Sequence, residues 1–227
     1  MRGFLLDLLF PVFCLNCGQE GDHLCQECLD LLIFRESLHC LKCKKQNTEN
    51  SLCPECASDY HIDKILIAGD YENKILAKLI KGLKYKFVID YAEILGNFLS
   101  NYLVEKSELN FSNVAIMPVP LHKKRLRWRG FNQSEKIAQI ISKNLNLNLD
   151  NQNLIRIKHK KAQAKLNEEQ RRKNIKNCFE FAGDNLKSKN IILVDDVTTT
   201  GSTLDECARI LKENGAENIW GLVVANG

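Results

Sequence analysis

Four C-x2-C pairs near the start of the sequence constrain this chain more than any other feature. Eight of its ten cysteines form these pairs, all within residues 14–56. A single pair could be a redox centre, but four pairs in so short a segment are typical of metal binding. Two pairs supply the four thiolates of a closed tetrahedral zinc site, with no position left for water. The pairs are Cys14 and Cys17, Cys25 and Cys28, Cys40 and Cys43, and Cys53 and Cys56.

The cysteine segment also repeats internally. CLNCGQEGDHLCQEC (14–28) and CLKCKKQNTENSLCPEC (40–56) each read C-L-x-C, a polar loop, then L-C-x-E-C. We therefore predict two zinc ribbons in tandem within a small unit at 1–58, one ion joining pairs one and two and another joining pairs three and four. A cross-braced wiring and a single filled site are the alternatives. So small a unit buries little core, so metal would supply much of its folding free energy.

The first thirteen residues, MRGFLLDLLFPVF, are apolar but are interrupted by Asp7 and Pro11. They lack a small-residue cleavage site, so we expect a short helix packed on the protein rather than a signal peptide, with loose contact to a membrane surface as the alternative. Without a leader, a secreted disulfide framework is disfavoured. No apolar run approaches the ~20 residues of a membrane-spanning helix, so we expect no transmembrane segment.

From about residue 59 the hydrophobic pattern changes to alternating strands and helices. Such alternation predicts an α/β domain at 59–227 with a parallel, doubly wound sheet and flanking helices. The expected strands are 62–70, 113–117, 154–157, 178–181, 189–195 and 219–224. The expected helices are 73–83, 90–104, 134–145 and 203–214. Ligands of such sheets gather beyond the carboxyl ends of the strands, which directs attention to the segments after Met117 and Val194.

The loop after Val194 contains the candidate ligand-binding residues. VDDVTTTGST (194–203) joins the strongest predicted strand to a helix. Backbone N–H groups at a helix N-terminus favour an anion, and the hydroxyls and glycine of this loop suit a phosphate monoester. The two carboxylates before them accept hydrogen bonds from sugar hydroxyls and attract Mg2+. The loop therefore fits a ribose 5-phosphate, whereas neither a Walker A loop nor a G-x-G-x-x-G fingerprint is present.

Charge is unevenly distributed along the chain. The net charge is +4, but residues 121–176 carry sixteen basic and four acidic residues, a local balance of +12. A basic middle on an acidic frame indicates a polyanionic partner, such as a phosphorylated small molecule or a nucleic acid, with a solvated surface as the plainer interpretation.

The aspartate loop resembles the signature of type I phosphoribosyltransferases for 5-phosphoribosyl 1-pyrophosphate (PRPP). VPLHKKRLRWRGFNQS (119–134) resembles a segment of ComF proteins, as do the cysteine pairs, the segment 59–85 ending in GLKY, and the segment 163–174 with its paired arginines. The resemblance covers essentially the whole chain. It implies a ComF-like protein of DNA uptake and natural transformation, with a double zinc ribbon followed by a phosphoribosyltransferase-fold domain.

The same resemblance implies roles for individual residues. Asp195 and Asp196 would hold the ribose hydroxyls, partly through Mg2+, at the catalytic centre. The loop 119–124 would take pyrophosphate, and a mobile loop at 160–173 would close over the site. The phosphate of PRPP would be held by Val197, Thr198, Thr199, Thr200, Gly201, Ser202 and Thr203.

Cations suited to pyrophosphate, to the closing loop or to DNA are concentrated in the basic segment. Among the aromatic residues there, Trp128 and Phe131 could stack a base or pack onto the domain. His122 could act as a base, although a loop histidine with its hydrogen bonds satisfied is the plainer interpretation. The candidates are His122, Lys123, Lys124, Arg125, Arg127, Arg129, Arg171 and Arg172.

Two functional hypotheses follow. By resemblance, the protein would assist import of single-stranded DNA at the cytoplasmic side of the inner membrane, as a cytoplasmic or membrane-peripheral protein. Its partners would be PRPP or a related ribose phosphate, single-stranded DNA, and a DNA-translocating helicase or other competence and recombination proteins. The alternative is an active phosphoribosyltransferase of nucleobase and nucleotide metabolism without a DNA role. The short segment after the last strand leaves little chain for a base-binding hood, which disfavours an ordinary salvage enzyme.

Overall fold

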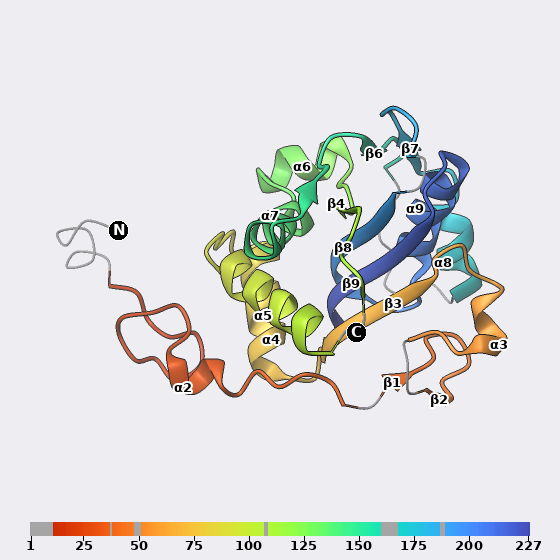
Figure 1. The fold of residues 1–227 in the computed structure, drawn as a ribbon. Coiled ribbons are helices and arrows are strands. Elements are labelled where there is room, and N and C mark those ends of the chain that lie inside the picture. The colour runs from red at the N-terminus through yellow and green to blue at the C-terminus, as the bar shows by residue number, and fades with distance from the viewer. Residues whose placement is uncertain (1–10, 37, 48–50, 107–108, 160–167, 187–188) are drawn as a thin grey trace.

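A five-stranded parallel sheet forms the centre of the computed structural model (Figure 1), which describes residues 11–36, 38–47, 51–106, 109–159, 168–186 and 189–227. The strand order is β3-β9-β8-β4-β5, and every neighbouring pair is parallel. The strands are β3 (Lys64–Asp70), β4 (Val114–Pro118), β5 (Asn148–Leu149), β8 (Asn190–Thr198) and β9 (Asn218–Asn226). The α/β architecture predicted from the alternating pattern is confirmed.

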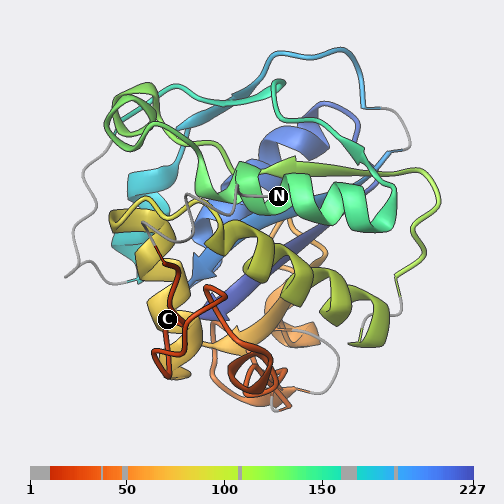
Figure 2. The same ribbon diagram turned by 90° about the vertical axis from the view of Figure 1, so that its left-hand side faces the viewer.

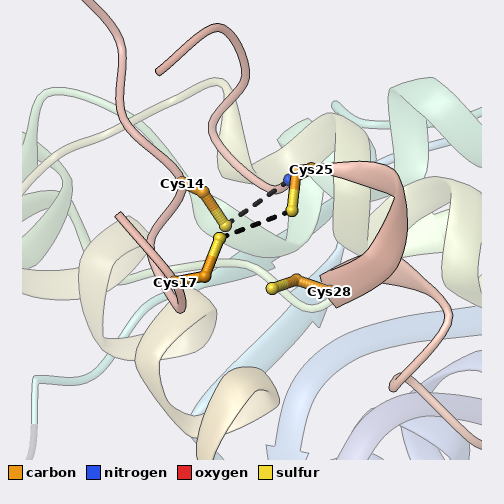
Figure 3. Close-up of side chains that lie close together, drawn as sticks. All are labelled: Cys14, Cys17, Cys25 and Cys28. Carbon is orange, nitrogen blue, oxygen red and sulfur yellow. Dashed lines mark hydrogen bonds between the residues drawn. The ribbon is translucent and has the colours of Figure 1, made fainter. Parts of the chain in front are cut away.

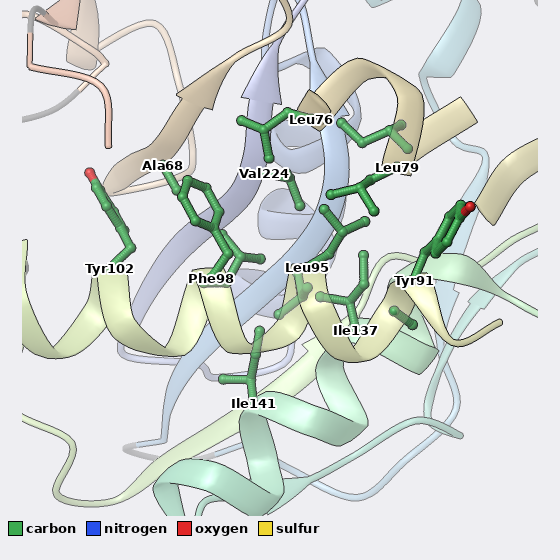
Figure 4. Close-up of a cluster of buried hydrophobic side chains, with 14 of the residues drawn as sticks. Ala68, Leu76, Leu79, Tyr91, Leu95, Phe98, Tyr102, Ile137, Ile141 and Val224 are labelled. Carbon is green, nitrogen blue, oxygen red and sulfur yellow. The ribbon is translucent and has the colours of Figure 1, made fainter. Parts of the chain in front are cut away.

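Three helices cover one face of this sheet: α4 (Lys74–Tyr85), α5 (Tyr91–Lys106) and α7 (Gln133–Leu145) (Figure 2). Their apolar sides meet in a buried cluster in which Leu79, Leu95 and Ile137 lie close to Val224 of β9 (Figure 4). Side chains alternate along a strand, so Val223 faces the opposite core. The sheet is therefore buried on both faces, which explains the nearly continuous apolar runs in its central strands.

The opposite face carries α9 (Ser202–Glu213) and α8 (Glu168–Ile175), together with a two-stranded antiparallel ribbon of β6 (Leu154–Arg156) and β7 (Phe179–Phe181). Two isolated cysteines, Cys178 and Cys207, are fully buried in this core. They pack as small hydrophobic residues. Burial also raises the pKa of Cys207 well above its usual value.

The cysteine-rich segments lie on opposite sides of the domain (Figures 1 and 2). The first, with α2 (Gln26–Leu29), shares the core of α4 and α5. After the first segment the chain runs along the edge strand β3 and reaches the second segment. The second segment contains β1 (Leu38–His39), β2 (Gln46–Asn47) and α3 (Pro54–Ala57). Its Leu41 and Leu52 belong to the core of the opposite face.

Most predicted elements of the α/β domain are present within a few residues, but two differ. The segment expected as a pyrophosphate loop becomes a helix, α6 (Lys123–Arg129), after only four residues. Strand β8 also continues through the two aspartates to Thr198, which shortens the phosphate loop to 199–201. In both places the loop prediction was too long because polar residues concealed regular backbone structure.

Two predicted segments lie wholly or partly outside the described residues. These are the N-terminal helix predicted over residues 1–13, of which only 11–13 are described, and the part of the closing loop at 160–167. The rest of that loop is helical, in α8. Residues 11–13 are not helical, because Phe13 forms an isolated antiparallel bridge with Glu20, so the helix prediction is wrong for this part. Among the helices of the described ranges, none has both the length and the apolar composition needed to cross a bilayer.

Candidate functional site: two cysteine clusters and an aspartate-lined cavity

The eight paired cysteines converge into two clusters. Within each cluster the four sulfur atoms lie within 4.8 Å of one another. The first cluster joins pairs one and two, as Figure 3 shows for its side chains, and the second joins pairs three and four. This is the tandem wiring rather than the cross-braced one. The clusters are Cys14, Cys17, Cys25 and Cys28, and Cys40, Cys43, Cys53 and Cys56.

The sulfur geometry fits zinc. The Sγ atoms of Cys17 and Cys25 are 3.6 Å apart, close to the ~3.8 Å expected between thiolates bound at about 2.3 Å around a tetrahedral ion. All ten cysteines are free thiols. Burial opposes ionisation of Cys14, but backbone N–H groups, including that of Cys25 at 3.5 Å from its sulfur, outweigh burial and lower its pKa to about 6. Both clusters are consistent with structural Zn2+.

Residues beside the second cysteine cluster contact the phosphate loop. Leu41, next to Cys40, is buried, and a Cβ added to Gly201 would lie 3.4 Å from its Cδ1 atom. The hydroxyl of Tyr60 donates a hydrogen bond to the carbonyl oxygen of Thr200 at 3.2 Å. The backbone N–H of Ser51 donates to the carbonyl of Ile65 on β3 at 3.1 Å. A segment predicted as a separate unit therefore forms one wall of the loop.

Asp195 and Asp196 stand near the carboxyl end of β8, where ligands of parallel sheets bind. The hydroxyl of Ser134 donates to Asp195 Oδ1 at 2.8 Å. Lys84 Nζ lies 3.0 Å from Asp196 Oδ1. Asp196 is buried, and within the part of the chain that the structure describes its Oδ2 atom has no hydrogen-bond partner. This orphaned carboxylate oxygen is the kind of ligand that Mg2+ prefers.

The two carboxylates influence each other electrostatically. Burial, and then the charge of Asp196, raise the pKa of Asp195 to about 7. Burial opposes ionisation of Lys84, but the charge and hydrogen bond of Asp196, together with the charge of Asp195, outweigh burial and raise the pKa of the ammonium group. A single ammonium group therefore balances only part of the acidic pair.

A cavity of about 400 Å3 opens beside the aspartates. This volume lies in the range of small-molecule sites. Asp195 and Asp196 line one part of it, while residues of α6 and of the segment before it line another. Four cationic side chains share the cavity with the two carboxylates, so its walls carry a net positive charge and suit an anionic ligand. These cations are Lys84, Arg125, Arg129 and Arg156.

The phosphate loop connects β8 to α9 through a left-handed Gly201, with φ of +72°. Thr198 Oγ1 accepts the Gly201 N–H at 3.1 Å, which fixes the turn. Gly201, the N-cap residue of α9, has no side chain to cap the helix; of the N–H groups in the first turn, that of Ser202 donates to Thr200 Oγ1 at 3.4 Å. The first turn of this twelve-residue helix therefore offers unsatisfied N–H groups and the positive end of the helix dipole. Val197 and Thr203 also line the cavity.

The predicted cations do not all reach this cavity. Arg125 and Arg129 line it, whereas Lys123, Lys124 and Arg127 are exposed on α6 and are not among its lining residues. From α8, on another side of the loop, Arg171 donates from Nη1 to Thr199 Oγ1 at 2.5 Å. The guanidinium of Arg172 lies 4.4 Å from the ring centroid of Tyr60.

The structure also distinguishes the alternatives for the remaining ring side chains. His122 Nδ1 accepts the N–H of Lys124 at 3.2 Å, so this histidine caps α6. Burial, together with His159 and neighbouring cations, lowers its pKa. Phe131 is buried and packs on the domain, whereas Trp128 is exposed at the cavity.

Several residues at the cavity were missed in the sequence. Lys84 and Tyr85 lie within the GLKY motif, whose resemblance to ComF proteins could have drawn attention to them. Ser134 and Gln133 end the other ComF-like segment; Gln133 accepts a hydrogen bond from Arg129. Arg156, on β6, had no sequence signal, because it reaches the cavity through the packing of the β6–β7 ribbon on the core of the sheet.

Comparison with known families agrees with these two kinds of site. Residues 5–61 match the double zinc ribbon domain model. Residues 132–226, which contain the aspartate pair, the phosphate loop and α9, match the phosphoribosyl transferase domain model.

Whole-chain relatives complete the comparison. Competence protein F of Haemophilus influenzae is 32% identical over 222 residues, which cover 88% of this chain and 96% of the relative. DNA utilization protein YhgH of Escherichia coli is 29% identical, covering 80% of this chain and 88% of the relative. Competence protein ComFC of Bacillus subtilis is 27% identical, covering 87% and 81%. With this similarity along nearly its whole length, the chain belongs to the competence protein F family and combines a double zinc ribbon with a phosphoribosyltransferase domain.

Proposed function

We propose that this protein acts in DNA uptake and natural transformation and that its phosphoribosyltransferase domain binds PRPP. One observation carries the proposal: the cavity is lined by two adjacent aspartates, by Thr203 in the first turn of α9 and by four cations. A ribose with phosphate groups at two positions requires hydroxyl acceptors between two anion sites. The names of the relatives, competence protein F and DNA utilization protein, support the role in DNA handling.

In the proposed complex, Asp195 and Asp196 accept hydrogen bonds from the ribose 2- and 3-hydroxyls. The loop from Thr198 to Thr203 binds the 5-phosphate through backbone N–H and hydroxyl groups, with the helix dipole favouring the negative charge. Arg129 binds the pyrophosphate end, where a cation stabilises the departing charge if transfer occurs. These groups bind and orient the ligand before any reaction.

Magnesium fits the same arrangement. The orphaned Oδ2 of Asp196 and the neighbouring carboxylate of Asp195 would hold the ion together with PRPP oxygens. When bound, Mg2+ would neutralise charge on the pyrophosphate and so favour its departure. Lys84 would keep its ion pair with Asp196 and limit the repulsion between the two carboxylates.

We propose that the two parts of the chain have separate roles. Residues 1–58 would form the zinc-stapled unit, and residues 59–227 the PRPP-binding domain. The protein would work at the cytoplasmic side of the inner membrane with single-stranded DNA and a DNA-translocating helicase or another competence or recombination protein. The exposed basic helix α6 supports a polyanionic partner.

Complementation tests this proposal. The chain is expressed in Haemophilus influenzae that lacks its own competence protein F, and transformation frequency is measured for the wild type and for Asp195→Asn/Asp196→Asn. We expect the wild type to restore transformation and the double variant to fail at equal protein abundance. Lys106→Gln, exposed at the end of α5 and neither on α6 nor in the cavity lining, is the control and should restore transformation.

Two results would overturn the proposal. If the double variant restores transformation as well as the wild type while PRPP binding is lost, PRPP binding does not serve DNA uptake. If the wild type fails to restore transformation but turns over PRPP with a free nucleobase at catalytic rates, the alternative of a metabolic phosphoribosyltransferase replaces it.

A further inference from the structure

Three exposed aromatic side chains lie beside the cavity, and its ligands in the proposed complex leave them unused. Tyr85 and Trp128 line the cavity, and each is 62% exposed. Phe87, 42% exposed, contacts Trp128 edge-to-face with ring centroids 5.5 Å apart. We call Tyr85, Phe87 and Trp128 the aromatic ledge. Exposed rings that pack on each other rather than in the core favour binding over folding as their role.

The backbone at Phe87 strengthens this interpretation. Phe87 has φ of +58° just after α4, where the N–H of Val88 returns to the carbonyl of Gly82 at 3.3 Å. This is the helix-ending position that glycine usually occupies, because a side chain is strained there. Phenylalanine at this position gains little from burial. An outlier of this kind at a cavity mouth points to a functional requirement for its ring.

Charge identifies the occupant. Arg125 and Trp128 are three residues apart on α6 and so lie on the same side of the helix, and both line the cavity. Cations beside exposed rings are the features that bind single-stranded nucleic acid, in which bases stack and phosphates pair with arginine. Duplex DNA keeps its bases stacked inside and offers them no face. A protein partner is less suited to this surface, because α6 also exposes Lys123 and Lys124, and lysine is depleted at protein interfaces.

We propose that the aromatic ledge is a stacking platform for an unpaired base of a DNA strand, with the adjacent backbone phosphate held by Arg125. This inference rests on the proposed function and adds the position and the mode of strand binding. The strand then lies across the mouth of the PRPP cavity, so the two ligands share α6. A free nucleobase would offer the same stacking chemistry, and the experiment separates that source.

The test measures binding of the full-length protein to fluorescent oligo-dT by anisotropy, with Phe87→Gly and Phe87→Leu. Either variant removes the ring, and we expect about 5- to 150-fold weaker binding, the range that loss of one base-aromatic stack corresponds to. Phe87→Gly relieves the strained backbone and should melt at or above the wild-type temperature, so misfolding does not explain its loss. Phe87→Tyr keeps a ring and should bind like the wild type.

An abasic oligonucleotide of equal length supplies the second arm. It has the same phosphate charge without bases, so wild type and Phe87→Gly should bind it equally. PRPP affinity should also be equal, because Phe87 does not line the cavity. If Phe87→Gly and Phe87→Leu bind oligo-dT as tightly as the wild type, the proposed role of the aromatic ledge is wrong, but the DNA role stands. If the wild type does not bind oligo-dT, the DNA role is wrong as well. Weaker PRPP turnover with free nucleobase, with oligo-dT binding intact, would assign the ledge to a free base and overturn the proposal.

Discussion

Replacing Gly201 by alanine tests how tightly the phosphate loop is held between β3 and the second cysteine cluster. Gly201 has φ of +72°, and a Cβ there would lie 2.9 Å from Ile65 Cδ1 and 3.4 Å from Leu41 Cδ1. Both neighbours are almost completely buried. They have little room to yield, so the loop itself should shift.

The magnitude has two parts. A left-handed conformation costs a non-glycine residue about 1–2 kcal/mol. Overpacking in a dense core adds roughly 1–3 kcal/mol. We therefore expect Gly201→Ala to lower the free energy of unfolding by about 2–5 kcal/mol. Gly130→Ala is the matched control, since Gly130 has φ of +82° but its added Cβ would meet no atom within 4 Å. Gly130→Ala should therefore lose only the conformational cost of about 1–2 kcal/mol.

Urea denaturation of both variants measures these values, and PRPP titration measures the loop. The reasoning predicts a larger loss of stability for Gly201→Ala than for Gly130→Ala, together with weaker PRPP binding. Equal losses of unfolding free energy in the two variants would show that Ile65 and Leu41 do not crowd a side chain at position 201. Unchanged PRPP affinity in a destabilised Gly201→Ala would refute the link between this contact and the phosphate site.

Three further predictions follow from other contacts. Cys17→Ser and Cys43→Ser should each release one of two zinc ions per chain, but PRPP binding should weaken in Cys43→Ser alone, because Leu41, beside the second cluster, packs against Gly201 of the loop. Equal PRPP affinities of the two variants would contradict this. Burial opposes ionisation of Glu206, yet hydrogen bonds from Arg209 and from the Asn177 N–H at 2.7 Å outweigh it and hold its pKa below the usual 4.5. The stabilisation from ionised Glu206 is therefore present above about pH 4.5 and is lost as the pH falls further. Glu206→Gln should lower the free energy of unfolding by about 1–3 kcal/mol in urea melts at pH 7 and by less at pH 4. A loss that does not depend on pH would contradict this role of Glu206. Lys84→Met leaves Asp196 buried without its cation and should cost about 3–5 kcal/mol, whereas exposed Lys86→Met should cost little; similar melts would contradict the ion pair.

The sequence predicted the sheet well because its signals are local. The apolar runs of β8 and β9 are buried on both faces, and so are recognisable without knowledge of their neighbours. Helix α6 was missed because its residues are nearly all cationic and show no apolar periodicity; only the cap from His122 and the left-handed Gly130 mark its ends.

The candidate site was predicted only in part, for a physical reason. Asp195, Asp196 and the phosphate loop are contiguous, so their spacing carries the chemistry. Lys84 and Arg156 reach the same cavity from α4 and β6, and no local pattern indicates such convergence. The contact of Tyr60 with Thr200 likewise depends on how the second cysteine segment passes the edge of the sheet.

Calorimetry of PRPP binding in the presence of Mg2+ tests the central claim most directly, by comparing the wild type with Asp195→Asn/Asp196→Asn. Loss of two charge-assisted hydrogen bonds at about 1.5 kcal/mol each corresponds to an affinity loss of roughly 150-fold. Circular dichroism and melting temperature verify that the double variant stays folded. The account predicts saturable, Mg2+-dependent heat for the wild type and little for the folded double variant; equal affinities would show that the aspartates do not hold the ribose.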